Sequence, residues 1–343
     1  MHFDVMPRAD SWENIAAFAR DVERVGMSGI LFTEGGQVPW MMIAAAAQAA
    51  PSLHHSTGIA VAFPRSPMVS AQVAWELAAN TQGKFRLGLG SQVKPHIERR
   101  YGVAFEQPAR RMRDYMLAVK ASICAFRGDE RLAHDGPFYK LNLLTPQWSP
   151  PRHDFEDIKI DMSAVNPLML KVTGEVADGL HVHPMHSMPY IQNRVLPALK
   201  EGVESAGRSL DDIDLIVPVL AVPGDSPEEQ ANMAREAKTA IGFYGSTPGY
   251  AFQFDDLGYE GVRVKLAETL RSGGRDALAA DVSDELLDQF GLVARWDDMA
   301  DKLIARYNVL ASRVVMYLAK PSILENPKNL EKWGEIARAV RAA

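Results

Sequence analysis

The sequence has little cysteine, no long hydrophobic run and no excess of positive charge. Its one cysteine, Cys124, excludes a disulfide framework and a cysteine-rich metal site. The longest apolar run, Val38 to Ala47, is much shorter than the ~20 residues that span a bilayer, so we expect no membrane segment. The net charge of −6 is not the basic footprint of a nucleic-acid-binding protein. Residues Met1 to Asp4 form no signal-peptide pattern, and we therefore expect a cytoplasmic protein.

What is present is typical of a globular protein, with 47% apolar and 23% charged residues among 343. That length suits two or three ordinary domains, or one barrel of ~250 residues with insertions. Short runs rich in β-branched residues alternate with amphipathic stretches, which indicates parallel strands joined by helices. The predicted strands are Phe3–Met6, Gly29–Thr33, Ser56–Ala62, Phe85–Gly88, Ile158–Met162, Gly179–His183, Leu215–Val222 and Arg313–Leu318. Eight parallel strands favour an α/β fold, a closed (β/α)8 TIM barrel.

Two stretches depart from this alternation. Residues from about 128 to 157 hold a proline cluster and little regular pattern, whereas residues from about 242 to 292 are rich in aromatic side chains. Long ordered segments of this kind usually form lids or binding loops. Because no linker-like tract divides the chain, we predict a single domain over residues 1–343 with both insertions at the C-terminal mouth of the barrel.

A glycine-containing turn follows the fourth predicted strand. Gly88 to Val93 lacks the third glycine of a dinucleotide fingerprint and the lysine of a phosphate-binding loop. The segment is therefore either a backbone cradle for a phosphate or a plain strand-to-helix turn. The nearby Lys94, His96, Arg99 and Arg100 form either a basic rim for an anionic ligand or a solvated helix face.

Two histidines lie in one predicted strand, and one glutamate follows another. His181 and His183 are spaced to share one strand face, so they form a zinc-ligating pair, a polar lining of the mouth or packed side chains. The zinc interpretation needs further ligands, and none stands out by spacing. Glu34, at the end of the second strand, is an active-site carboxylate or a capping acid. Cys124 lies on an amphipathic stretch with no basic partner to activate it, so we expect a buried, inert thiol.

Three segments together resemble the bacterial luciferase-like superfamily of flavin- and deazaflavin-dependent oxidoreductases. They are Thr57–Pro67 (TGIAVAFPRSP), Phe85–His96 (FRLGLGSQVKPH) and Gly174–Gly179 (GEVADG), and the resemblance spans nearly the whole chain. The combination is most similar to the branch of luciferase-like oxidoreductases that depend on coenzyme F420, while other relatives use FMN.

The resemblance implies that the cofactor ring lies at the C-terminal mouth of the barrel. It places a bulge with a non-proline cis peptide bond at Gly58-Ile59, which backs the ring. The predicted cofactor-binding residues are Gly58, Ile59, Gly90, Ser91, Gln92, Ala164, Val165 and Asn166. The last three open a helix whose backbone N–H groups would hold the cofactor phosphate.

The chain departs from its relatives at two places. Relatives often carry glycines in the phosphate segment, where this chain has Ser163 to Pro167. Deazaflavin alcohol dehydrogenases carry an Asp-His-like pair after the second strand, and this chain has Glu34-Gly35 instead. The resemblance therefore argues against alcohol oxidation by that histidine mechanism. It also places Trp40 in the wall of the substrate pocket, beside His181 and His183, or in the packing around it.

These observations predict hydride transfer between F420 and a small organic substrate, with Glu34 as the candidate catalytic residue that orients the substrate or ring edge. An FMN-dependent monooxygenase of the same fold is one alternative, and a non-catalytic flavin-binding relative is another. A metal-dependent hydrolase built on His181 and His183 is the alternative from a different class. The expected partner is a small molecule, with no nucleic acid, membrane or bound metal, and the resemblance implies a homodimer.

Overall fold

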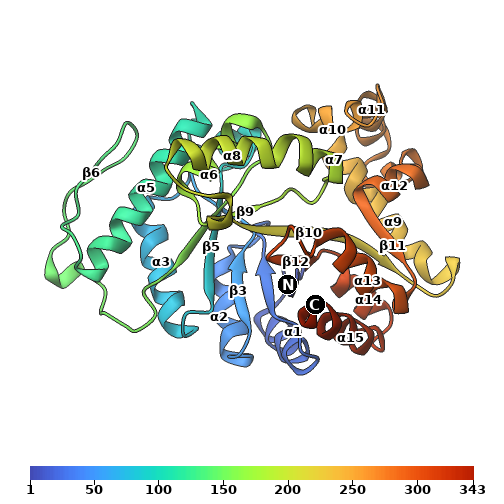
Figure 1. Cartoon of the computed structure of the whole chain (residues 1–343), viewed down its shortest axis with the longest axis horizontal. Helices are drawn as coiled ribbons and strands as arrows, with labels where there is room; N and C mark the ends of the chain where they lie inside the picture. Colours follow the sequence, from blue (N-terminus) through green and yellow to red (C-terminus); the bar gives the residue numbers. More distant parts are fainter.

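Eight parallel strands close into a barrel, as the sequence predicts (Figure 1). The computed structural model describes residues 1–343. The first barrel strand pairs with the second and with the last, so the eight strands form a closed ring. The barrel strands are β1 (His2–Val5), β2 (Gly29–Phe32), β3 (His54–Thr57), β5 (Phe85–Gly90), β8 (Lys159–Ser163), β9 (Gly179–His181), β10 (Asp214–Pro223) and β12 (Arg313–Met316).

Most strand boundaries lie within two residues of the predicted ones, and three differences concern the barrel mouth. The predicted strand Ser56–Ala62 is interrupted, and β4 (Ala60–Val61) resumes after β3 ends. β9 stops at His181, two residues earlier than predicted, because the chain turns before Pro184. β11 (Gly291–Ala294) was not predicted. It pairs with Leu220–Pro223 of β10, which is ten residues long and extends past the barrel wall.

Helices surround the barrel, and their ends follow the sequence signals. The Ser11 and Ser226 hydroxyls cap α1 and α9, and Gly128 ends α5 in the left-handed conformation. No helix combines the length and the apolar character needed to cross a membrane. The helices are α1 (Trp12–Arg24), α2 (Pro39–Ala49), α3 (Pro67–Asn80), α4 (Lys94–Arg99), α5 (Pro108–Arg127), α6 (Pro167–Val176), α7 (Met188–Tyr190), α8 (Leu196–Ser205), α9 (Pro227–Gly245), α10 (Phe252–Asp255), α11 (Val262–Gly273), α12 (Asp284–Phe290), α13 (Trp296–Tyr307), α14 (Ala319–Glu325) and α15 (Asn329–Ala342).

The first insertion, residues 128–157, has little regular structure, as predicted. It contains a hairpin of two short strands, β6 (His134–Asp135) and β7 (Lys140–Leu141), and extends to one side of the barrel in Figure 1. Asp114 of α5 anchors the hairpin, since its carboxylate accepts hydrogen bonds from the Phe138 and Tyr139 backbone amides at 2.7 and 2.9 Å. The insertion is thus held at one buried carboxylate.

The second insertion, residues 242–292, is mostly helical and lies on the other side of Figure 1, where α10, α11 and α12 gather. Its apolar side chains form a second hydrophobic core. That core also includes Met185 after β9, Leu220 and Val222 near the end of β10, and Leu318 after β12. The insertion therefore packs against the C-terminal ends of three barrel strands, which is the face where active sites of such barrels lie.

Candidate functional site at the barrel mouth

The interruption between β3 and β4 lies at Gly58 and Ile59, and the cis peptide bond expected there is present. Neighbouring groups from the end of β2 hold this bulge. The Thr33 hydroxyl donates to the carbonyl of Gly58, and the backbone amide of Glu34 donates to the carbonyl of Ile59 at 3.2 Å. The bulge is therefore a fixed part of the barrel mouth.

Gly90 joins this bulge to the next strands. Val61 of β4 pairs with Gly90, and β5 pairs with β8 on its other side. A Cβ atom at Gly90 would lie 2.4 Å from Ser163 Oγ and 2.9 Å from Ile59 Cδ1, so no side chain fits there. The structure thus brings Ile59 and Gly90 together beside Ser163, which directly precedes the third predicted cofactor segment.

The turn after β5 is closed by its own side chains. Gln92 has a positive φ of 58°, and its side-chain carbonyl accepts a hydrogen bond from the Val93 amide at 2.9 Å. The Ser91 hydroxyl donates to the Gln92 carbonyl at 3.2 Å. Both side chains are half-buried. The turn therefore has a defined shape beside Gly90, with the exposed basic residues of α4 following it.

The N-terminus of α6 is open. Asn166 precedes the helix in an extended conformation, and its side chain makes no capping hydrogen bond. By contrast, serine hydroxyls cap α1, α3, α9 and α12. Asn166 and Leu168 are exposed, so the first-turn amides and the positive end of the helix dipole face solvent. This geometry fits an anionic group such as a phosphate.

The Glu34 cluster consists of Glu34, Arg65, Tyr101, Trp40 and the backbone amide of Val61. Arg65 binds the carboxylate through both nitrogens, at 2.7 and 2.8 Å. The Val61 amide donates to Oε2 at 2.7 Å, and the Tyr101 hydroxyl lies 3.3 Å from Oε1. Burial and the Glu34 carboxylate raise the pKa of Tyr101. The Arg65 guanidinium lies 5.7 Å from the centroid of the half-buried Trp40 ring.

These contacts fill the acceptor capacity of Glu34, because a carboxylate accepts about four hydrogen bonds. The Glu34 side chain is only 3% exposed. Its geometry supports a positioning role, in which the carboxylate ties the end of β2 to the first residues of β4. The sequence analysis predicts that Glu34 contacts a substrate. Such a contact would have to displace one of these donors.

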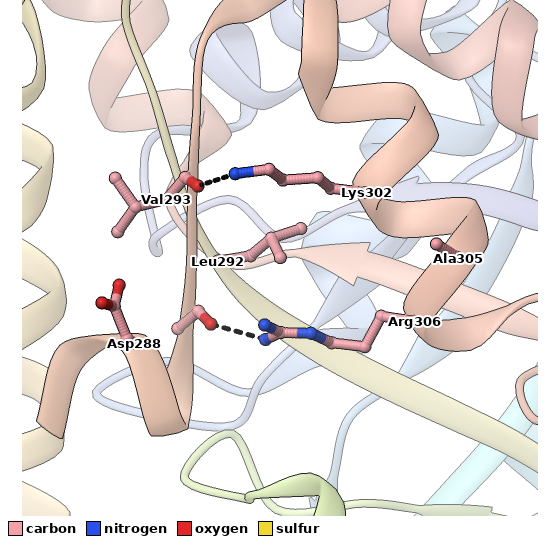
Figure 2. A pocket seen from close by; sticks show the side chains of 7 residues that line it. Asp288, Leu292, Val293, Lys302, Ala305 and Arg306 are labelled. Carbon is pink, nitrogen blue, oxygen red and sulfur yellow. Dashed lines mark hydrogen bonds between the residues drawn. The ribbon is translucent and has the colours of Figure 1, made fainter. Parts of the chain in front are cut away.

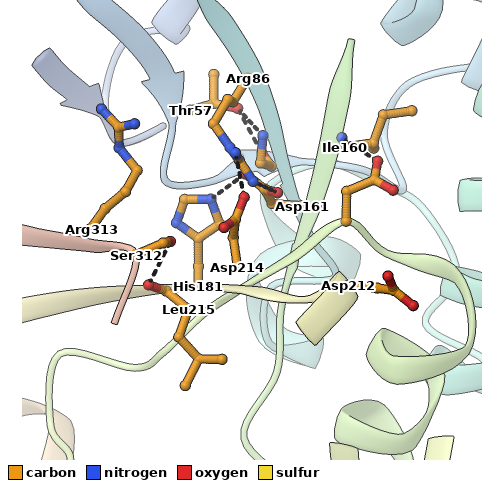
Figure 3. A network of polar contacts seen from close by, with 12 residues as sticks. Thr57, Arg86, Ile160, Asp161, His181, Asp212, Asp214, Leu215, Ser312 and Arg313 are labelled. Atoms are coloured by element: carbon orange, nitrogen blue, oxygen red, sulfur yellow. Dashed lines mark hydrogen bonds and ion pairs between the residues drawn. The ribbon is translucent and has the colours of Figure 1, made fainter. Parts of the chain in front are cut away.

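His181 lies inside the barrel, in the ion-pair network of Figure 3. Arg86 binds Asp161 at 2.6 and 2.9 Å and Asp214 at 2.7 Å. The Nε2 atom of His181 lies 3.5 Å from Asp161 Oδ2, and a Cβ atom at Gly88 would approach it to 2.5 Å. Burial alone would raise the pKa of Asp161, but the Arg86 guanidinium reverses this and holds it well below its usual range. In this network beneath the mouth, one guanidinium faces two carboxylates.

His183 has different surroundings from His181. Its ring centroid lies 4.7 Å from that of Tyr244 and 4.3 Å from that of Tyr250. Tyr244 lies near the end of α9, and Tyr250 follows that helix in the second insertion. Burial lowers the pKa of His183 to about 4. The Tyr244 hydroxyl is hydrogen-bonded to that of Tyr317, which follows β12. The aromatic residues of the insertion therefore meet the ends of β9 and β12 at this histidine.

A zinc site on the two histidines is not supported. No group of three or more histidine, cysteine, aspartate or glutamate side chains is arranged to hold a metal ion. His181 is directed to the Arg86 network and His183 to the tyrosines, because β9 ends between them. The hydrolase alternative was wrong for this reason, since the shared strand face on which it depended does not form.

A cavity of about 520 Å³ lies beside β11 and α13, apart from these clusters (Figure 2). Its two cations are used by the fold. Lys302 donates to the carbonyl of Val293 at 3.0 Å, and Arg306 donates to that of Gly291 at 2.6 Å. Both carbonyls belong to β11, an edge strand, so the side chains cover its unpaired acceptors.

Sequence reasoning missed several partners in the site. Arg65 lies in the turn after the third strand, but its partner Glu34 cannot be identified from spacing. Tyr101 gave no signal. Tyr244, Tyr250 and their contact with His183 were signalled only by the aromatic composition of the second insertion. In each case the contact joins segments far apart in the sequence.

Comparison with known proteins agrees with this architecture. An uncharacterized protein of Mycobacterium tuberculosis is 33% identical over 294 residues, which cover 86% of each chain. The coenzyme F420 dependent tetrahydromethanopterin reductase of Methanopyrus kandleri superposes with a TM-score of 0.79 at 19% identity, covering 97% of both chains. The oxygenating constituent of 3,6-diketocamphane monooxygenase from Pseudomonas putida, in complex with FMN, gives 0.67 at 15% identity, covering 99% of this chain and 98% of that one.

At these low identities the two solved structures show that the fold is shared. Membership of a family is shown by the sequence. The model of the luciferase-like monooxygenase family matches residues 1–313, which is most of the chain. The protein therefore belongs to the luciferase-like monooxygenase family, as the three sequence segments predicted.

Proposed function

We propose that the protein is an oxidoreductase that transfers a hydride between the deazaflavin coenzyme F420 and a small organic substrate. The combination of bulge, Gly90 turn and open α6 N-terminus carries this proposal, because it fits a flat ring with a phosphate-bearing side chain. The relative from Methanopyrus kandleri, which depends on F420, supports the choice of cofactor. When bound, the deazaflavin supplies the two-electron hydride chemistry.

The chain's own residues would bind and orient the reactants. Gly58 and Ile59 back the ring, while Gly90, Ser91 and Gln92 line the polar side chain of the cofactor. The backbone amides of Ala164, Val165 and Asn166 and the following helix turn hold the phosphate. Close placement of donor and acceptor carbons lowers the barrier by several kcal/mol through orientation alone.

The groups around the ring position these elements and exclude water. In this proposal Glu34 fixes β4 through the Val61 amide, and Trp40 forms part of the substrate wall behind Arg65. The second insertion covers the ends of β9, β10 and β12. Excluding water there strengthens each hydrogen bond to the substrate.

A titration of F420 fluorescence with the wild-type protein and Asn166→Asp tests this proposal. The new carboxylate would cap α6 and repel a phosphate at the same place. We expect F420 affinity to fall by about tenfold or more, while the melting temperature stays equal or rises. The neutral control Asn166→Ala should remain within about threefold of the wild type. Equal affinity in Asn166→Asp would remove α6 from the cofactor site.

The FMN-dependent monooxygenase is the second candidate, since the Pseudomonas putida structure of this fold binds FMN. A reduced flavin reacts with oxygen, whereas a deazaflavin resists that reaction because carbon replaces the ring nitrogen that supports it. Oxygen consumption with reduced FMN and a candidate substrate would favour this alternative. Stable cofactor binding without turnover over a broad substrate panel would favour a non-catalytic binding protein.

The homodimer implied by the family stays a prediction. Light scattering after gel filtration distinguishes a 37.8 kDa monomer from a species of twice that mass. We expect the larger species, and a mass that stays at the monomer value across micromolar concentrations would contradict it.

A further inference from the structure

His183 presents one ring nitrogen to the protein and leaves the other without a partner. Its Nδ1 atom lies 3.1 Å from the backbone nitrogen of Met185 and 3.4 Å from the Met185 carbonyl oxygen. The amide N–H is a fixed donor at the shorter distance, so Nδ1 is the acceptor. The neutral ring must then carry its proton on Nε2.

This Nε2–H group is available to a ligand. No protein atom accepts from it. The Nε2 atom of His181 is also without a hydrogen-bond partner, but it is sealed inside the barrel. The His183 side chain is half-buried, and its Nε2 is not among the sealed atoms. The Nε2–H donor lies just after the C-terminal end of a barrel strand, which is where substrate-binding groups of such barrels are found.

Aromatic side chains hold the ring in one orientation. Tyr244 meets it edge-on, with 81° between the ring planes, and Tyr250 packs at 39°. The hydroxyl of Tyr244 is fixed in turn by Tyr317. Because the ring is clamped on more than one side, its free N–H has a defined direction before any ligand binds. Preorganised donors of this kind stabilise negative charge that develops on a reacting oxygen.

The surroundings keep the imidazole uncharged. Burial is the main cause of its lowered pKa, the Met185 contact opposes the shift, and His186 adds to it. Arg306 lies near His186, and Arg275 lies over the Phe243 ring at 4.8 Å and acts on Tyr244 and Tyr317. No carboxylate contributes to the pKa of His183, so the site offers neither an anion to charge the ring nor a free base.

We propose that the Nε2–H of His183 donates a hydrogen bond to an uncharged carbonyl oxygen of the substrate, so that the enzyme reduces a carbonyl compound. This inference rests on the proposed hydride transfer. A carboxylate or phosphate substrate would need a cation beside the imidazole, and no lysine or arginine contributes to the pKa of His183.

In the proposed step the carbonyl carbon would receive the hydride that a bound reduced deazaflavin supplies, and a new C–H bond would form there. The π electron pair of the C=O bond moves onto oxygen, and water supplies the proton that completes the alcohol. The cofactor is oxidised by two electrons and the carbonyl is reduced by two. His183 holds the oxygen through its N–H and keeps its own proton.

The first test is nitrogen NMR of the full chain labelled at histidine, with the His183 signal assigned by its loss in His183→Phe. We expect a protonated Nε2, an unprotonated Nδ1 and no titration between pH 5.5 and 8. Cyclohexanone, a neutral carbonyl probe, should shift the Nε2 signal in a saturable way, whereas cyclohexanecarboxylate should not. A protonated Nδ1, a titration in that range, no response to cyclohexanone, or a stronger response to the carboxylate would each overturn the proposal.

Variants then measure the strength of the contact through the Met185 amide signal. His183→Phe keeps the ring packing and should weaken cyclohexanone binding by about tenfold, the value of one hydrogen bond of about 1.4 kcal/mol. His183→Asn, which keeps an N–H donor, should recover part of that loss. His55→Phe replaces another buried histidine by the same ring and should bind like the wild type. Unchanged binding in His183→Phe would overturn the proposal.

Cofactor binding is read separately. His183→Phe should keep wild-type F420 affinity in the fluorescence titration, because the substrate contact is not a cofactor contact. If the wild-type chain fails to bind F420, the hydride-transfer proposal fails. The tautomer and the response to cyclohexanone are still measured on the cofactor-free protein, so the two failures are distinguishable.

Discussion

The Glu34 cluster and the His183 cluster lie at different strand ends of the same barrel. The His183 cluster consists of His183, Tyr244, Tyr250 and the Met185 amide. The two clusters differ in the hydrogen-bonding groups that they leave without a partner. Every acceptor position of Glu34 is taken by Arg65, Val61 or Tyr101. His183 is equally well fixed, but one of its two nitrogens meets no protein atom. A buried charge with a full set of partners indicates a structural joint, whereas a fixed donor without a partner indicates a place for a ligand.

The ion-pair layer beneath the mouth extends this comparison, since Arg86 in it binds two carboxylates. Asp161→Asn removes the charge that faces Arg86 and leaves a guanidinium buried with Asp214 alone. We expect the free energy of unfolding in urea to fall by about 3–5 kcal/mol, the usual cost of breaking a buried pair. The exposed pair of Asp135 and Lys140 serves as control, and Asp135→Asn should change nothing measurable. A loss below about 1 kcal/mol in Asp161→Asn would show that the layer does not stabilise the barrel.

The two mouth clusters should separate stability from ligand binding. Glu34→Gln breaks the two-point contact with Arg65, and we expect a loss of about 2–3 kcal/mol in the same urea experiment. His183→Phe removes no hydrogen bond except that of the Met185 amide, so its loss should be within about 1 kcal/mol. Equal destabilisation by the two changes would contradict the distinction between a filled joint and a free donor.

The pH dependence of stability sharpens the same distinction. Burial lowers the pKa of His183 to about 4, below the unfolded value of 6.5. Between pH 4 and pH 6.5, His183 is therefore protonated in the unfolded chain and neutral in the native chain. The stabilisation that the native state gains from a neutral His183 is complete above pH 6.5 and is lost as the pH falls toward 4. In this range the free energy of unfolding falls by up to about 1.4 kcal/mol per pH unit.

His54, His55 and His186 share this lowered pKa of about 4, chiefly because each is buried. Urea unfolding at a series of pH values should show a slope that His183→Phe reduces by one proton. His55→Phe is the matched change and should reduce it equally. A slope that His183→Phe leaves unchanged would mean that this imidazole is charged or solvated in the native protein.

The barrel could be predicted because its signals are local. Most of the eight strands are short runs with apolar or β-branched residues, and parallel strands buried on both faces need no long-range information to be identified. The bulge at Gly58 and Ile59 came from the resemblance, and the structure contains it. Ser11 caps α1 and Gly128 ends α5, and such residues are local signals because capping depends on a few neighbouring residues.

The pairing of side chains could not be predicted in the same way. Arg65 reaches Glu34 across 31 positions, and Tyr250 reaches His183 across α8, β10 and α9. Such contacts depend on how the strand ends and the second insertion pack against each other. The spacing of residues in the sequence does not reveal this packing. The two histidines were expected on one strand face because the period of two was extended past His181, where β9 ends before Pro184.

The most direct test of the whole account is a parallel equilibrium titration of the wild-type chain with oxidised F420 and with FMN. Fluorescence of each cofactor reports its binding. The account predicts saturable one-to-one binding of F420 that is at least about tenfold tighter than that of FMN, a difference of about 1.4 kcal/mol. Tighter binding of FMN, or no binding of F420, would contradict it.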